Sequence, residues 1–266
     1  FAAFTGRVQT YGKISVRNAG SGTIYYQSGD QLLAGQRGKV VLDDNSNNVG
    51  RGYAVPFFHA DETNLTAFAS IVITNGGALR IDTVNPVVWT NLNAHLVCAG
   101  AGDASVVVFD EARVDYFPAL TVDGYTLDFR DSDPKTVSNM TIRSGATVTL
   151  TGARTLAVSV TGDLTVESGG MLTMNRKGFS PGSGPGRPAP GAATWVGGGY
   201  GGQGADVNAL ATSRPTYGSF LNPTHAGSPG NGSQATAAGA GSMQLVVDGA
   251  TMLDGSIAAD GGPARN

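Results

Sequence analysis

The sequence predicts an all-β fold, and more narrowly a parallel β-solenoid, in which short strands from successive turns of the chain stack on one another. The first observation is an eight-residue period in residues 140–175, where apolar-x-apolar triplets alternate with stretches rich in Gly, Ser, Asp and Thr. The second is composition, since 40 of the 266 residues are glycine and only 14% are charged. The third is that helical spacing of apolar residues never dominates for more than a few positions.

Each triplet of residues 140–175 is predicted to be a short strand whose alternate side chains point inward, and the intervening residues are typical of turns. Three octads make one three-sided coil of about 24 residues, which places Met140 beside Leu164 and Val148 beside Leu172. The interior is then a column of stacked aliphatic side chains. The predicted core of this stretch comprises Met140, Ile142, Val148, Leu150, Leu156, Val158, Leu164, Val166, Leu172 and Met174.

The same period occurs before residue 140. One series runs through Val16, Ile24, Leu32 and Val40, and another runs from residue 71 to residue 97. Looser triplets at 106–108, 114–116, 120–122 and 127–129 link these series to residue 140. The earlier series add Ile71, Ile73, Leu79, Ile81, Val87 and Trp89 to the predicted core. For the Trp89 side chain, burial in the core is favoured over an exposed platform on which sugars would stack.

Two segments interrupt the period, and both are interpreted as loops of a single solenoid domain spanning residues 1–266. Residues 43–70 are a polar turn and an aromatic excursion, and residues 177–241 (the glycine-rich segment) have few aliphatic side chains. Ordering such a chain costs about 1–2 kcal/mol per residue in backbone entropy. We expect hydrogen bonds between close-packed glycine backbones, and docking on the solenoid wall, to offset this cost. The predicted docking or contact side chains are Trp195, Tyr200, Tyr217, Phe220 and Leu221.

Several stretches of the chain resemble a known repeat. "LTVESGGMLTMNRKGFSPGSGPG", "GGGYGGQG", "YGSFLNPTHAGSPG" and "MQLVVDGATMLDGSIAADGG" are similar to the glycine-rich β-helix repeat of very large bacterial secreted and surface proteins. "FTGRVQTYG" and "GSGTIYYQSGDQLLAGQRGKVVLDDN" resemble a later part of that repeat, and only residues 83–135 match it in general terms alone. The resemblance implies a right-handed parallel β-helix, export to the cell exterior, roles in adhesion or surface structure, and no defined catalytic activity. It also implies that the chain is a segment of a longer repeat protein or filament.

Charge and cysteine content argue against nucleic-acid binding and against a disulfide-stabilised fold. A net charge of −3 gives no basic footprint for nucleic acid, and the single Cys98 excludes an internal disulfide framework. No apolar run reaches the roughly 18 residues of a membrane span, and no cofactor motif is present. The partners we expect are copies of the chain or neighbouring repeats, which would cover the open strand edges at the coil ends. Surface glycans are a further expected partner of the Thr/Ser/Asn-rich sides.

Catalytic or metal-binding chemistry has few candidates. "DFRDSD" supplies Asp128, Asp131 and Asp133, but it lacks the downstream bidentate Glu of a calcium loop, so a solvated turn is the favoured interpretation. Arg130 and Lys135 lie beside these aspartates, where a polysaccharide lyase would carry its base and its calcium ligands. An ice- or crystal-binding solenoid would need a regular threonine ladder, which the sequence does not predict. The expected function is therefore non-catalytic, structural or adhesive and extracellular, and the alternative is a carbohydrate-active β-helix protein.

Overall fold

The structure is a computed structural model, and it describes part of the chain in detail. The described residues are 22–34, 37–43, 57–58, 68–74, 76–81, 96–99, 104–108, 116–117, 119–130, 133–152, 155–188, 196–200, 216–219, 221–230 and 238–262. Several predicted positions lie outside them, namely Val16, Val87, Trp89, Asp131, Trp195 and Phe220.

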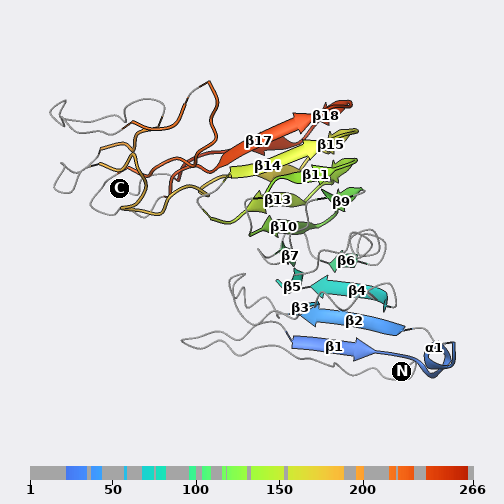
Figure 1. Cartoon of the computed structure of the whole chain (residues 1–266). Coiled ribbons are helices and arrows are strands. Elements are labelled where there is room, and N and C mark those ends of the chain that lie inside the picture. Colours follow the sequence, from blue (N-terminus) through green and yellow to red (C-terminus); the bar gives the residue numbers. More distant parts are fainter. Residues whose placement is uncertain are drawn as a thin grey trace.

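The fold is all-β with mainly parallel sheets, as the sequence predicts. The described strands stack from β1 to β18 as Figure 1 shows, and the helix α1 (Gly29–Leu33) has 5 residues. This helix corrects one prediction, because Leu32 was expected in a strand and lies in α1 instead. No helix in the described part of the chain is both long enough and apolar enough to span a membrane.

The N-terminal sheet departs from the predicted parallel stacking. Its order is β1-β2-β4-β6, formed by Gly22–Tyr26, Arg37–Asp43, Phe68–Thr74 and Leu96–Ala99. β1 runs antiparallel to β2, so that Ile24 pairs with Val41, whereas β2, β4 and β6 are parallel. The eight-residue spacing of Ile24, Leu32 and Val40 therefore runs through a strand, a short helix and a returning strand, and it does not mark three equivalent strands.

Three further sheets hold the remaining strands. The seven-stranded sheet has the order β19-β16-β13-β10-β7-β5-β3, formed by Ser256–Ala258, Met171–Thr173, Thr147–Leu150, Tyr125–Phe129, Ala104–Val108, Ala78–Ile81 and Phe57–Phe58. The second sheet is β17-β14-β11-β8, formed by Ser242–Val247, Thr155–Val160, Lys135–Val137 and Tyr116–Phe117. The third is β18-β15-β12-β9, formed by Thr251–Leu253, Leu164–Val166, Met140–Ile142 and Leu120–Val122. From β8 onward the chain visits the second, third and seven-stranded sheets in strict rotation, and each visit adds a strand parallel to the previous one.

The register follows the sequence period only in part. Met140 pairs with Leu164 and Val148 with Leu172, 24 positions on in each case. Leu120, however, pairs with Met140 only 20 positions on. The turn length is thus not constant, because the corners between strands differ in length while the strands keep their apolar-x-apolar form.

The core is one cluster of buried side chains that runs through the stacked strands. All ten residues predicted for it between 140 and 174 are at most 3% exposed, and Ile73 and Leu79 are equally buried. Ile71 and Ile81 lie in β4 and β5, but their side chains are outside the description. Phe117 and Phe129 add an edge-to-face aromatic pair with ring centroids 6.1 Å apart.

A threonine ladder that the sequence did not predict runs along the third sheet. Thr121, Thr141 and Thr165 occupy equivalent positions of β9, β12 and β15, each between two buried residues. The ladder is one residue wide, since each strand has one outward position, and Met252 takes its place in β18.

Candidate functional site

Two charged residues of the segment in which a lyase site was considered, Asp128 and Lys135, are buried. Asp128 lies in β10 and is 0% exposed, so the prediction that "DFRDSD" is a solvated turn is wrong for this residue. The Oδ2 atom of its carboxylate lies 3.2 Å from Arg130 Nη2 and accepts a hydrogen bond of 2.9 Å from Thr151 Oγ1. Asp133 is exposed. Asp128 and Asp133 therefore do not present one common face to a substrate or a cation.

Lys135 is buried as well, at 1% exposure. It occupies the first inward position of β11, pairs with Val158 of β14, and holds its ammonium 5.8 Å from the centre of the Phe129 ring. This burial was not predicted from the sequence, although Lys135 stands two residues before Val137, the spacing of an inward pair. A base enclosed in this way cannot reach a polysaccharide bound on the outside.

A chain of hydrogen bonds links this charged segment to the root of the glycine-rich segment. Lys177 Nζ donates to Thr151 Oγ1 at 3.0 Å, and Thr151 donates in turn to Asp128. The three residues belong to three successive turns of the chain, so the relay ties those turns together at one corner. These hydrogen bonds therefore have a structural role, since they hold three successive turns together. In the described part of the chain, no three His, Cys, Asp or Glu side chains converge as metal ligands would.

The described parts of the glycine-rich segment are joined by backbone hydrogen bonds, as expected. Phe179 donates its N–H to the Gly227 carbonyl at 3.0 Å and accepts from the Gly239 N–H at 3.0 Å, and Gly227 donates to the Ala240 carbonyl at 2.7 Å. A Cβ on Gly239 would overlap the Gly227 carbonyl, and a Cβ on Gly178 would lie 2.5 Å from that same oxygen. The close approach of these backbones thus requires glycine.

Aromatic side chains of the segment pack on one another. Tyr217 stacks edge-to-face on Tyr200, with centroids 5.1 Å apart, and on Phe179 at 6.5 Å. Its hydroxyl donates to the Ala226 carbonyl and accepts from Ser228 Oγ at 3.0 Å. Burial raises the pKa of Tyr217, and the Ser228 hydrogen bond lowers it by a smaller amount.

The contacts with the strands come from smaller groups than expected. Ser242 at the start of β17 donates its Oγ to the Pro223 carbonyl at 2.8 Å, and Thr155 at the start of β14 donates its Oγ1 to the Thr224 carbonyl. Leu221, an expected docking residue, is 81% exposed. Figure 1 shows the described parts of the segment extending to the left of the strands instead of along their faces.

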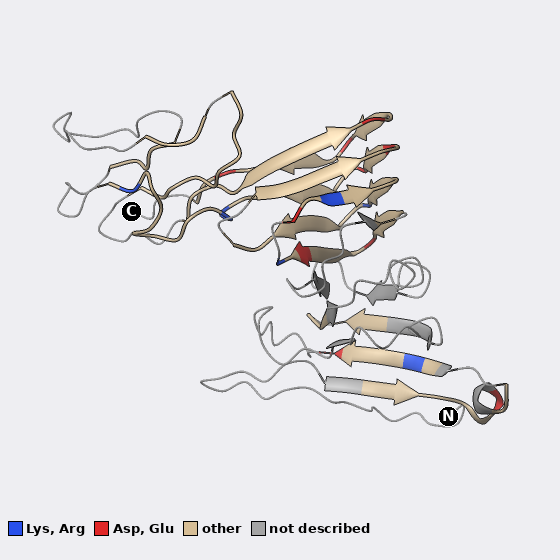
Figure 2. Cartoon of the chain, viewed as in Figure 1, with Lys and Arg blue, Asp and Glu red and all other residues tan. Residues whose placement is uncertain are grey.

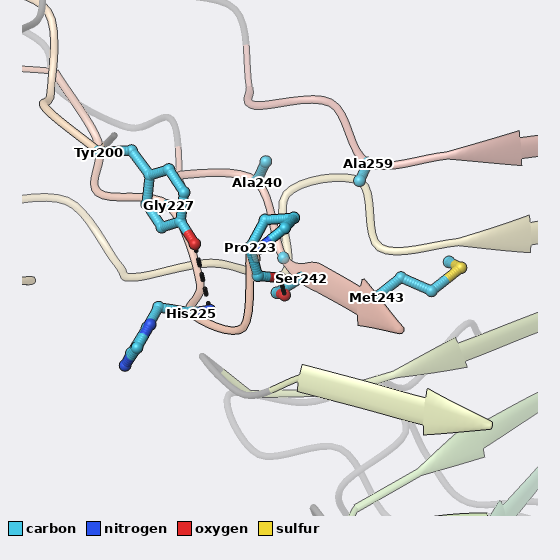
Figure 3. Close-up of a pocket in the computed structure, with 9 residues that line it drawn as sticks. Tyr200, Pro223, His225, Gly227, Ala240, Ser242, Met243 and Ala259 are labelled. Carbon is cyan, nitrogen blue, oxygen red and sulfur yellow. Dashed lines mark hydrogen bonds between the residues drawn. The ribbon is translucent and has the colours of Figure 1, made fainter. Parts of the chain in front are cut away.

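A cavity of about 360 Å³ lies between this segment and the start of β17. Figure 3 shows Tyr200, Pro223 and His225 on one side, with Met243 and Ala259 on the strand side. The Tyr200 hydroxyl accepts from the His225 N–H at 3.3 Å, and the Ser242 hydroxyl is turned to Pro223. The Tyr200 and Ser242 hydroxyls thus bond to the backbone, and His225 Nδ1 lies 3.3 Å from Thr224 Oγ1 of the neighbouring residue.

The stack has an open end at its C-terminal side. β17, β18 and β19 are each the last strand of their sheets among the described strands (Figure 1). Leu253 pairs with Val166 and Ile257 with Leu172, so both continue the core columns. Yet Leu253 is 48% and Ile257 39% exposed, whereas the two residues below them are fully buried. We call this surface, made by β17, β18 and β19, the open end.

Comparisons with known proteins give no relative for the chain. No family model matches it, and neither a curated protein nor a solved structure does. The similarity to glycine-rich β-helix repeats therefore rests on the sequence motifs alone.

Proposed function

We propose that this protein is a structural β-solenoid, a right-handed parallel β-helix that forms part of an extracellular rod or self-stacking filament. The strict rotation of the chain through three parallel sheets supports the solenoid, because each turn adds one strand to each sheet. Right-handedness and export follow from the resemblance to secreted glycine-rich repeats. An adhesive role toward surface glycans would use the hydroxyl-bearing outer positions such as Thr141 and Thr165.

The observation that carries the proposal is the open end. Three strand edges have no described partner, and the core columns reach solvent at Leu253 and Ile257. Edges of this kind pair readily with further strands. Since the surface is open across all three sheets, the natural contact is another turn of the same kind, supplied by a copy of the chain or by a neighbouring repeat. Such a contact is heterologous and propagates along the axis.

A matched pair of variants tests this function. Leu253→Asn changes the open end, and Leu221→Asn changes an exposed leucine in the glycine-rich segment. Sedimentation velocity over a concentration series, with negative-stain imaging, should show lengthwise association of the native chain. We expect this association to be weakened by Leu253→Asn and retained in Leu221→Asn. A native chain that stays monomeric at high concentration, or assemblies indifferent to Leu253→Asn, would contradict the proposal.

The carbohydrate-active alternative finds little support among the described residues, because Asp128 and Lys135 are enclosed. Panels of uronic-acid and neutral polysaccharides should yield neither unsaturated products nor new reducing ends. A clear rate that Arg130→Ala abolishes would instead establish an enzyme.

A further inference from the structure

We propose that the turn which covers the open end carries a lysine or arginine above Asp254, so that the partner is a β-strand turn with an apolar interior and a basic corner. This inference rests on the proposed function and specifies the partner's chemistry. It follows from the charges that the structure stacks at one corner of successive turns.

That corner lies just after each strand of the third sheet. Arg143 follows β12 and donates its N–H to the Val122 carbonyl at 2.9 Å. Glu167 follows β15 and donates to the Ile142 carbonyl at 2.9 Å, and Asp254 follows β18 and donates to the Val166 carbonyl at 2.8 Å. Together with Asp123, which follows β9, these residues form one column along the stack. We call it the charged corner.

One ion pair of the charged corner joins two successive turns. Arg143 Nη1 lies 2.7 Å from Asp123 Oδ2, one turn down, although both side chains are about half exposed. Above Arg143 the order continues with Glu167, again of opposite sign. Strands in a sheet lie about 4.8 Å apart, so side chains in the same column are near neighbours, and opposite charges there are favourable.

The alternation fails at the open end. Asp254 stands directly above Glu167, and like charges opposite one another on adjacent strands are unfavourable. In the part of the chain that the structure describes, no ion pair reaches Asp254. A cation in the next turn would pair with Asp254 as Arg143 pairs with Asp123. If the charges along the corner are to alternate again, the turn above Asp254 must carry a lysine or arginine at the same position.

The other corners of the last turn carry the same sign. Asp248 and Asp260 are exposed and, with Asp254, give residues 242–262 three acidic residues and no lysine or arginine. Figure 2 shows red at the ends of the uppermost strands. Two open ends placed face to face would bring these acids together, so the charge disfavours a symmetric head-to-head pair. It favours a partner turn with basic corners.

An added turn in two forms tests the inference. A second copy of residues 155–174, which holds one strand for each sheet, is fused after Asn266. One form keeps the copied Glu167, and in the other the copy carries Glu167→Arg, which sets a cation over Asp254. We expect both forms to lower the binding of a hydrophobic dye to the chain. The arginine form should melt about 2 °C above the glutamate form, and this gap should close in 1 M salt or with Asp254→Asn.

The outcomes separate the inference from the proposed function. Equal melting of the two forms, with dye binding reduced in both, would overturn the basic corner while leaving the stacking function intact. Unchanged dye binding and no added β signal in circular dichroism for either form would contradict stacking itself.

A second measurement does not depend on the fused turn. The native chain is compared with a variant that combines Asp248→Asn, Asp254→Asn and Asp260→Asn. If the acids select the partner, their removal lets two open ends meet, and the variant should form dimers at concentrations where the native chain does not. Identical sedimentation of the two proteins at low ionic strength would overturn the inference.

Discussion

Val148→Asp is the most direct test of the inward and outward assignment of the strands. Val148 lies in β13, is 0% exposed, and pairs with Leu127 below and Leu172 above, both also 0% exposed. A carboxylate there has aliphatic neighbours in its column on both sides, so it cannot remain charged without a large desolvation cost. The group is instead expected to be neutral in the folded protein.

The size of the effect follows from that neutrality. An aspartate has an ordinary pKa of about 3.9, and each pKa unit corresponds to about 1.4 kcal/mol, so a neutral carboxyl at pH 7 costs about 4 kcal/mol. Loss of the buried valine side chain adds about 1.5 kcal/mol. The total of about 5–6 kcal/mol is comparable to the whole stability of many domains. The introduced aspartate has a raised pKa in the folded protein. The destabilisation of about 4 kcal/mol should therefore vanish below pH 4 and grow as the pH rises above 4.

Denaturant unfolding at pH 7 and pH 4 measures both shares, and Thr141→Asp is the matched control. Thr141 lies in the threonine ladder at an outward position of β12, two residues before Arg143, so the free energy of unfolding of this variant should change by less than about 1 kcal/mol. Thr149 would be the adjacent choice, but it is only 2% exposed. Equal losses in the two variants, or a Val148→Asp deficit that does not shrink at pH 4, would refute the assignment.

Three further variants test the hydrogen-bonded features. Tyr217→Phe should cost about 1 kcal/mol at neutral pH. The native chain should lose stability above about pH 10, as the pH rises through the raised pKa of Tyr217, whereas Tyr217→Phe should not. A difference in melting temperature between the two proteins that does not narrow at high pH would contradict this role of Tyr217. Gly239→Ala should remove amide protection at Gly227 in hydrogen exchange and leave β13 protected, whereas uniform loss would show that the segment is not a separate unit. Lys177→Met should lower the free energy of unfolding by about 1–3 kcal/mol, since it breaks the link to Thr151, and an unchanged value would exclude this structural role.

Sequence reasoning predicted the parallel stacking best where the period is unbroken. Between residues 140 and 174 the apolar triplets gave the strands, their inward faces and the pairing of Met140 with Leu164. The same reasoning failed at Leu32, because an isolated apolar residue at the right spacing can equally lie in a single turn of helix. Period alone also does not give the pairing direction, which is why the antiparallel β1 was missed.

The charged segment was mispredicted for a different physical reason. Sequence polarity predicts exposure only where a polar residue can reach water, and Asp128 stands between Leu127 and Phe129 on the outer side of a strand whose two faces are both covered. Its burial depends on Thr151 and Lys177, which follow 23 and 49 positions later in the chain. Contacts between turns of unequal length are not visible in a local pattern. For the same reason the threonine ladder emerged only once the register was known.

The glycine-rich segment raises the question of how a long insertion leaves the stack in register. β14 pairs with β17, and β16 with β19, on either side of it, although Leu156 and its partner Met243 are 87 positions apart. The ends of the insertion meet where Gly241 donates its N–H to the Met174 carbonyl at 2.8 Å, and Gly178 donates to Gly239 at 2.8 Å just outside. These bonds bring the two ends of the insertion together, so the chain leaves β16 and enters β17 at nearly the same point, as it does at the other corners. The entropy of closing a loop grows only with the logarithm of its length, and the glycine backbones supply hydrogen bonds that offset it. The insertion can thus vary in length and surface while the column beneath it continues, provided that the glycines at its root are kept.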